Sequence, residues 1–259
     1  MAFAAAVKKH TTLISALVMR EVTTRFGREG IGFLWVIGEP LMFCVGVLIM
    51  WGFIKPEYEH GVRVGPFVMT GYMCLLILRH MVTGSIGAVQ ANVGLFHHRQ
   101  VSVNHVMFAR NLSEFMGGSL AFVIVYAALI ILGECELPWN WMLFYGGWFL
   151  NAWVAFGLSY LFAALSVRFE IMERIVPVAT YAMIPASGCF TMASLIPDKY
   201  REGYLLIPMP HGVEMVRGAV FGEFVHVYYH PWYAFAWGAV LLFSGIVLLS
   251  DAKDRVLID

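Results

Sequence analysis

Charged residues are scarce in this sequence of 259 residues. Lys, Arg, Asp and Glu make up 13% of the chain and hydrophobic residues 60%, whereas a soluble domain is about 25% charged and about 45–50% apolar. A formal net charge of +0 with no basic stripe excludes a nucleic-acid-binding protein. The apolar residues fall in long blocks and the mean hydropathy is +0.74. The composition therefore indicates a membrane protein that crosses the bilayer several times.

Signatures of catalysis and of metal binding are also missing from the sequence. The 4 cysteines are far apart and form no CxxC pair, which excludes a disulfide framework and a zinc site. Neither a GxxxxGK[ST] nor an HExxH motif occurs; His211 and Glu214 share a helix face but have no third metal ligand near them. No long apolar core precedes a cleavage site at the N-terminus, so we expect no cleaved signal peptide. The chain is therefore expected to have no catalytic centre, no metal and no bound cofactor of its own.

Six apolar blocks approach or reach the roughly 20 residues that a helix needs to cross a bilayer. They are residues 32–54, 66–86, 115–132, 142–167, 175–196 and 232–249. The sequence thus predicts an all-α polytopic membrane protein with six transmembrane helices and a single transmembrane domain over residues 1–259. Most Lys and Arg residues between the blocks fall on the side that also holds both termini. Because short loops rich in these cations stay inside the cell, both termini are predicted to be cytoplasmic.

Three segments outside the blocks are predicted to be helical without crossing the membrane. Residues 8–28 favour an amphipathic helix on the cytoplasmic leaflet, with its cations toward anionic headgroups, over a helix packed on a soluble domain. Residues 90–111 are too polar to span and too apolar for a free loop, so we expect one or two docking helices there. Residues 197–231 form the longest external connection, in which the stretch from Pro210 to Gly222 is predicted to be a re-entrant or interfacial helix.

Ionisable residues occur inside two of the apolar blocks. Glu39 lies in the first block, and Arg79 and His80 lie in the second. A charge within the membrane is costly, and it marks a candidate functional site. Counted from the cytoplasmic ends of the blocks, Glu39 and Arg79 both lie roughly 10 Å deep. We hypothesise that these two side chains either form an ion pair or face one shared polar canal.

The stretch RFGREGIGFLWVIGEPL (residues 25–41) resembles the N-terminal signature of the type 2 ABC exporter permeases that move polysaccharides. In that family an amphipathic helix ends in Arg-aromatic-Gly, and a Gly-x-x-Trp entry and a Glu-Pro pair follow in the first span. The stretches PASGCF (185–190) and MPHGVEMVRGAVFG (209–222) are similar to a fifth-span motif and an external motif of the same family. The resemblance covers essentially the whole chain and points toward the capsular polysaccharide permeases, the KpsM-like group. Phe26 and Met209 depart from the family's commoner Tyr and Asn.

The resemblance implies a half-transporter in the bacterial inner membrane. Two copies would form a homodimer around a canal, and two copies of a separate ATPase, which binds ATP and Mg2+, would attach beneath it. The substrate would be a lipid-linked, often acidic capsular polysaccharide. A periplasm-spanning polysaccharide co-polymerase and an outer-membrane export protein would be further partners. The chain would not be an enzyme by itself.

The candidate site residues fall into three groups. Sugars stack on aromatic faces, so the canal candidates combine ionisable and aromatic residues of the spans: Trp35, Glu39, Phe43, Tyr72, Arg79, His80, Tyr181 and Phe190. For any one of these aromatics, a packed or lipid-facing role stays open. The residues expected to contact the ATPase are Phe96, His97, His98, Arg99 and Val101. The external helix contributes His211, Glu214 and Arg217, of which Glu214 and Arg217 are expected to be able to pair on one helix face.

Other functions remain open at this point. Within the transporter class, the substrate could be another glycan such as O-antigen or teichoic acid, a lipid or a drug, and a channel is also possible. A membrane-embedded enzyme that modifies glycans or lipids would need a cluster of acids or histidines at one leaflet, which the sequence does not show. A non-transporting scaffold would not need Arg79 inside a span. A partner ATPase with a P-loop would favour export over all of these.

Overall fold

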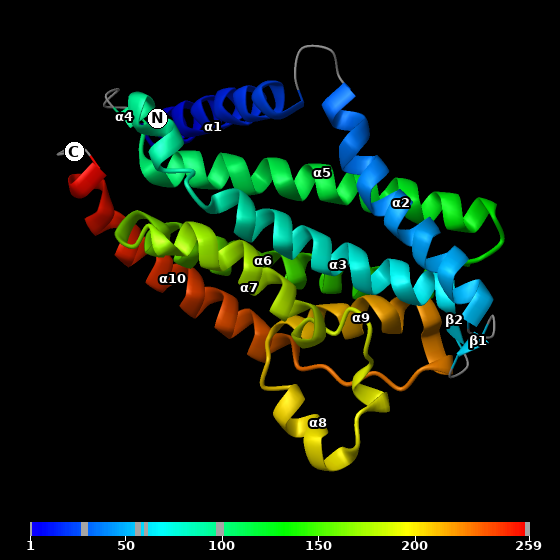
Figure 1. Ribbon diagram of the computed structural model, residues 1–259. Coiled ribbons are helices and arrows are strands. Elements are labelled where there is room, and N and C mark those ends of the chain that lie inside the picture. The colour runs from blue at the N-terminus through cyan, green and yellow to red at the C-terminus, as the bar shows by residue number, and fades with distance from the viewer. Residues whose placement is uncertain (1, 27–30, 55–57, 60–61, 97–100, 257–259) are drawn as a thin grey trace.

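A computed structural model of the chain describes residues 2–26, 31–54, 58–59, 62–96 and 101–256, and these residues are mainly helical (Figure 1). The long helices are α1 (Ala2–Phe26), α2 (Ile31–Ile54), α3 (Val64–Ser85), α5 (Val103–Ile131), α6 (Trp141–Arg168), α7 (Ile171–Ala186) and α10 (Pro231–Val256). The shorter helices are α4 (Val93–Phe96), α8 (Asp198–Tyr204), α9 (Met209–Phe221) and the 3-10 turns η1 (Gln90–Asn92), η2 (Ala193–Leu195) and η3 (Gly222–Phe224). Strands β1 (Tyr58–Glu59) and β2 (Val62–Arg63) pair antiparallel.

Four of the described helices are long and apolar enough to cross a membrane. They are Val64–Ser85, Val103–Ile131, Trp141–Arg168 and Pro231–Ser250. These helices agree with the prediction of an all-α membrane protein. α2 adds 24 residues that are mostly apolar. α7, with 16 residues, is shorter than the roughly 20 residues that usually cross a bilayer.

α7 ends at Ala186, although the apolar block predicted there runs to residue 196. Pro185 lies inside its last turn, and proline cannot donate the backbone N–H that a helix interior needs. Gly188 then has a φ of +80°, a left-handed conformation that favours glycine. A Cβ at this position would also lie only 2.7 Å from the Tyr204 hydroxyl. The rest of the apolar block therefore folds into a turn and η2.

α5 begins at Val103, well before the apolar block predicted from residue 115. Ser102 caps this helix, because its Oγ accepts a hydrogen bond from the His105 N–H at 3.3 Å. In return, the Ser102 N–H donates to His105 Nδ1 at 3.1 Å. These reciprocal bonds form a capping box, which fixes the first turn of a helix. The end of the predicted docking segment is thus the beginning of α5.

α3 is the central helix of the bundle, and most of its side chains are buried. α5 and α6 both pack against it, and α10 runs along α6. α9 lies very close to α6, since a Cβ on Gly147 of α6 would lie 2.8 Å from the Gly212 carbonyl oxygen of α9. Glycine at such contacts lets two helix backbones approach each other. All residues of α9 are buried as a result.

Both chain ends lie at one end of the bundle together with α1 and α4, whereas α8 and α9 lie toward the opposite end (Figure 1). Leu13 and Leu17 of α1 pack against a buried cluster that includes Val89, Phe96 and Leu249. The apolar side of α1 therefore rests on the same end of the bundle as α4.

Candidate functional site

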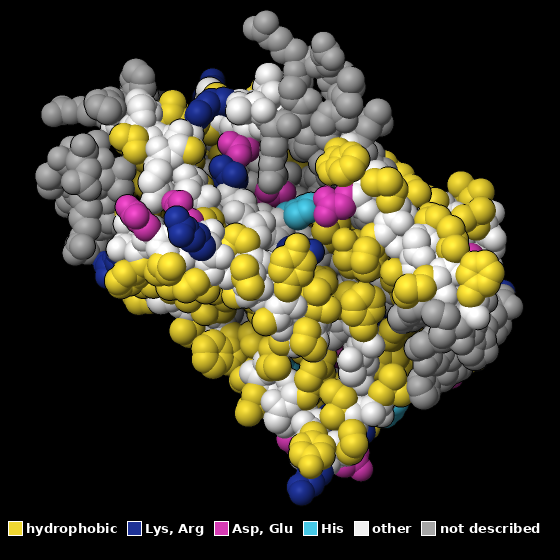
Figure 2. Space-filling view, in the orientation of Figure 1, with side chains coloured by type: hydrophobic (Ala, Val, Ile, Leu, Met, Phe, Trp, Pro, Cys, Tyr) yellow, Lys and Arg dark blue, Asp and Glu magenta, His cyan; other side chains and the backbone are white. Residues whose placement is uncertain are grey.

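Charged and aromatic side chains from α2, α3 and α7 meet on one face of the bundle. Glu39 Oε2 in α2 lies 3.6 Å from His80 Nε2 in α3, and both side chains are about one-third exposed. The neighbouring Arg79 places its guanidinium carbon 4.6 Å from the ring centre of Tyr181 in α7. Arg79 also lies close enough to Glu39 for the two charges to interact. Charged side chains gather in the upper part of the face shown in Figure 2, and hydrophobic side chains cover most of the surface below them.

An aromatic group adjoins these polar side chains. Phe43, one turn beyond Glu39 on α2, stacks on Tyr72 of α3 with ring centres 3.6 Å apart and an interplanar angle of 13°. Phe190, in the turn after α7, lies with its ring centre 6.4 Å from that of Phe43. We call Glu39, Phe43, Tyr72, Arg79, His80, Tyr181 and Phe190 the α2–α3–α7 cluster. The side chains of this cluster suit the binding of an acidic sugar, because sugar rings stack on aromatic faces and a guanidinium donates hydrogen bonds to anions.

The structure thus brings the canal candidates together, with the exception of Trp35, which is 64% exposed on α2. The pairing within the cluster differs from the ion pair that we hypothesised. Glu39 contacts His80 instead of Arg79. The Nε of Arg79 is buried and has no hydrogen-bond partner among the described residues. The described residues thus show no ion pair between Glu39 and Arg79, and the shared polar canal stays a prediction.

Arg217 of α9 is fully buried and binds the turn that follows α7. Its guanidinium donates to the carbonyl oxygens of Gly188 at 2.7 Å, Thr191 at 2.7 Å and Cys189 at 2.5 Å. The guanidinium carbon also lies 4.2 Å from the ring centre of Phe67 in α3. Buried charges are tolerated when hydrogen bonds satisfy them, so Arg217 ties α9 to this turn.

Glu214 and His211, on the same face of α9, bind further backbone groups. Glu214 accepts hydrogen bonds from the N–H of Ala193 at 3.1 Å and of Tyr228 at 3.3 Å. The imidazole of His211 lies 2.9 Å from the Leu205 carbonyl oxygen through Nε2 and accepts from the His230 N–H at 3.0 Å through Nδ1. A ring that accepts at Nδ1 and donates at Nε2 is neutral. Burial lowers the pKa of His211 in the same sense.

Glu214 and Arg217 were expected to be able to pair with each other on one face of α9. Glu214 and Arg217 do lie on one side of α9, but both bind backbone groups of the segment that follows α7, and Glu214 also binds the Tyr228 N–H. Both side chains are almost fully buried, at 1% and 0% exposure. The spacing of three residues was visible in the sequence, but the loops that these side chains reach are adjacent only after folding.

The segment expected to contact the ATPase lies at the end of the bundle that holds both termini. Phe96 and Val101 are buried in the cluster beneath α1, whereas His97, His98 and Arg99 lie outside the described residues. A cavity of about 800 Å³ separates η1 and α4 from the turn between α6 and α7. It is lined by Gln90, Val93, Ser166, Val167, Glu170, Ile171, Glu173 and Arg174.

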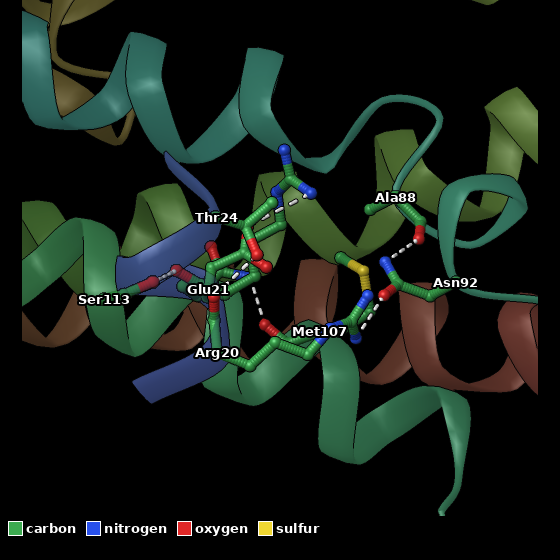
Figure 3. Close-up of polar contacts among 9 residues, drawn as sticks. Arg20, Glu21, Thr24, Ala88, Asn92, Met107 and Ser113 are labelled. Carbon is green, nitrogen blue, oxygen red and sulfur yellow. Dashed lines mark hydrogen bonds and ion pairs between the residues drawn. The ribbon is translucent and has the colours of Figure 1, made fainter. Parts of the chain in front are cut away.

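Polar contacts between α1 and the neighbouring segments were not predicted from the sequence. Arg20 Nη1 donates to Asn92 Oδ1 at 2.8 Å, and Asn92 Nδ2 donates to the Ala88 carbonyl oxygen at 2.8 Å (Figure 3). Glu21 Oε1 lies 3.3 Å from Arg110 Nη1 of α5. Of the cations expected to face lipid headgroups, Arg20 binds Asn92 of the chain itself, and the neighbouring Glu21 binds α5. A helical pattern reveals which residues share a face, but not what that face contacts.

In the described part of the chain, no group of three or more His, Cys, Asp and Glu side chains could hold a metal ion. Similarity to known proteins points instead to transport. Over 94% of its length the chain is 35% identical to the capsule polysaccharide export inner-membrane protein CtrC of Neisseria meningitidis serogroup B, covering 92% of that protein. It is 34% identical to the inner-membrane protein BexB of Haemophilus influenzae, again over 94% of the chain and 92% of BexB.

A third relative is the polysialic acid transport protein KpsM of Escherichia coli, which is 27% identical over 94% of the chain and 95% of KpsM. The sequence model of the ABC-2 type transporter family matches residues 12–221 of the chain. This range includes α2, α3, α7 and α9. The chain therefore belongs to the ABC-2 type transporter family.

Proposed function

We propose that this chain is the membrane permease subunit of an ATP-driven exporter that moves lipid-linked capsular polysaccharide across the bacterial inner membrane. The observation that carries the proposal is the α2–α3–α7 cluster, where several aromatic rings and an arginine, which has no hydrogen-bonded acid among the described residues, lie among apolar helices. Such a site can stack on sugar rings and attract acidic groups. Family membership and the functions named for CtrC, BexB and KpsM agree with it.

The proposed topology has six spans, formed by α2, α3, α5, α6, α7 and α10. α1 would lie at the cytoplasmic surface, both termini would be cytoplasmic, and α9 would be a re-entrant helix at the outer side. The position of both chain ends beside α1 and α4, away from α8 and α9, supports this orientation (Figure 1). So does the bias of Lys and Arg toward that side of the sequence.

The proposed assembly is a homodimer with a canal between the two copies. Large apolar side chains are exposed on α2 and α7 beside the cluster: Met42, Val45, Ile49, Ile175 and Val178. A second copy would cover this face and place the two clusters opposite each other. The short α7 suits such a role, because a helix too short to cross lipid alone is better accommodated next to protein.

Two copies of a separate ATPase would supply ATP and Mg2+, since the sequence has no P-loop. Residues 90–111 are proposed to carry the contact, with η1, α4 and the adjoining cavity forming the surface. Because Phe96 and Val101 are buried, the contact would rely on the more polar His97, His98 and Arg99. A periplasm-spanning co-polymerase and an outer-membrane export protein would continue the path beyond the membrane.

Reconstitution tests this function. The chain and its ATPase would be purified together in proteoliposomes, and ATP-dependent movement of a lipid-linked acidic capsular polysaccharide would be measured. Export that requires both subunits is the expected result. If the complex instead moved only O-antigen, teichoic acid, lipid or a drug, the corresponding alternative would replace the proposal. A chain that modifies the glycan without ATP would indicate a membrane-embedded enzyme.

A further inference from the structure

We propose that Arg79 and Tyr181 form a subsite for an anionic group of the exported glycan, a carboxylate or a phosphate, and that His80 is a positioning residue which keeps Glu39 from neutralising Arg79. The inference rests on the proposed export function and adds to it a ligand chemistry and a division of roles within the cluster.

The unused hydrogen-bonding capacity of Arg79 is the first observation. Guanidinium groups carry five N–H donors, and an arginine inside a membrane segment normally pairs with an acid or a backbone carbonyl. The described contact of the Arg79 guanidinium is the ring of Tyr181, 4.6 Å away and 59% exposed. Its Nε has no hydrogen-bond partner within the described parts of the chain. Because this Nε is buried, an incoming carboxylate or phosphate would bind the two Nη atoms of the guanidinium, which can hold it in a bidentate manner.

The position of Glu39 is the second observation. Glu39 is close enough to Arg79 for their charges to interact, and an ion pair between them would use the donors that an anion needs. Glu39 Oε2 instead lies 3.6 Å from His80 Nε2. Because consecutive residues of an α-helix point about 100° apart, an acid held by His80 is directed away from the side chain of Arg79. Without His80, Arg79 would be the basic side chain left near Glu39 among the described residues.

The aromatic rings near Arg79 indicate that the anionic group belongs to a sugar. Tyr181 offers an exposed face beside the guanidinium, whereas Tyr72 is buried and its ring is stacked on Phe43. Aromatic faces bind the apolar faces of sugar rings, and the cation binds an acid on such a ring. Together they fit an acidic sugar unit better than a neutral sugar or a plain hydrocarbon chain.

A matched pair of probes separates charge from the rest of the ligand. The complex of the chain with its ATPase, in nanodiscs, is titrated with n-dodecyl β-D-glucuronide and with n-dodecyl β-D-glucoside, which lacks the carboxylate. The wild-type complex is expected to bind the glucuronide about 10-fold more tightly, and Arg79→Gln is expected to abolish this preference. If Arg79→Gln does not fold, Arg79→Lys, which keeps the charge without the planar fork, is expected to reduce the preference severalfold. An unchanged preference in the variant that folds would overturn the subsite.

The role of His80 is tested by a rescue. His80→Ala is expected to reduce the preference for the glucuronide to near that of Arg79→Gln, and the double variant His80→Ala/Glu39→Gln is expected to restore most of it. If His80 only packed the helices, the double variant would stay as weak as the single one, which would overturn the positioning role. Lys199→Gln and His226→Ala, which change a cation and an imidazole outside the cluster, are matched controls that should keep the wild-type preference.

Polysaccharide transport, measured with the same preparations, distinguishes failure of the anion subsite from failure of the proposed export function. A wild-type complex that exports polysaccharide while its glucuronide preference survives Arg79→Gln would overturn the subsite alone. A preference that depends on Arg79 in a complex that exports no glycan would overturn the proposed function and leave an anion site in place.

Discussion

At the scale of single residues, Arg217 is a fully buried arginine that donates hydrogen bonds to three backbone carbonyl oxygens. Its replacement by Leu would leave the carbonyl oxygens of Gly188, Cys189 and Thr191 buried without these donors. Since an unpaired buried polar group costs about 1–3 kcal/mol, we expect Arg217→Leu to lower the yield of folded protein sharply. Thermal unfolding in detergent measures the effect. Arg174→Leu, which removes an arginine at the opposite end of the bundle, should unfold near the wild-type temperature, and equal losses in both variants would contradict the assignment.

His211 provides a prediction for pH. Burial lowers its pKa below the ordinary value of 6.5, so the unfolded chain binds more protons than the folded chain as the pH falls through that value. The stability contributed by neutral His211 is thus fully present above about pH 6.5 and decreases toward the lowered folded-state pKa. His211→Gln, which can still donate to Leu205 O and accept from His230 N, should lose stability less steeply between pH 7 and pH 5 than wild type.

Thermal unfolding of both proteins across this range gives the comparison. Other titrating groups, including Glu214, are common to both proteins and cancel in the difference. Parallel curves would show that His211 does not titrate on unfolding in this range.

The residues of the α2–α3–α7 cluster show how far sequence reasoning reaches at this scale. Counting along the spans placed Glu39 and Arg79 at one depth, and both belong to the same cluster. Counting could not decide whether Glu39 would contact Arg79 or its neighbour His80, because that depends on how α2 and α3 are rotated against each other. The backbone partners of His211, Glu214 and Arg217 could not be predicted from the sequence for a different reason. They lie in irregular loops, whose conformation no hydrophobic periodicity reveals.

At the scale of helices, the contact of α1 with α5 is open to a direct test. His10 Nδ1 lies 2.9 Å from His105 Nε2 and the two rings stack with centres 5.0 Å apart. In a background without the native cysteines, His10→Cys/His105→Cys should form an intramolecular disulfide on mild oxidation. Mass spectrometry of the digested protein would identify the linked peptides. Thr11→Cys/His105→Cys, in which the first residue points elsewhere on α1, is the control and should cross-link much less.

Helix existence was more predictable than helix ends. Long apolar runs indicate helices at membrane depth, and helices do occupy each predicted block. The ends of α5 and α7 departed from the blocks, because a polar capping box starts α5 early and Pro185 with Gly188 stops α7 short. A hydropathy profile reveals neither the capping box nor the Pro185–Gly188 turn, because both act through the backbone.

At the scale of the whole molecule, the exposed face of α2 and α7 predicts where a second copy packs. Val178 is 68% exposed on α7, and Val123 is 62% exposed on α5. Trp in place of Val is compatible with lipid but would clash in a close protein contact. Val178→Trp is therefore expected to shift the chain from dimer to monomer in native mass spectrometry, while Val123→Trp should remain dimeric. Dissociation of both variants, or of neither, would place the contact elsewhere.

The tertiary arrangement of α9 has a consequence for how the protein can vary. Its three polar side chains bind backbone N–H and C=O groups, which every residue offers except for the missing N–H of proline. The loops that α9 binds can therefore exchange most of their side chains without losing these bonds, with Gly188 a fixed point because of its φ. A single α9 sequence can in this way hold loops of many sequences. If α9 lies at the outer side as proposed, the opening of the exporter can change with the polymer while α9 stays the same.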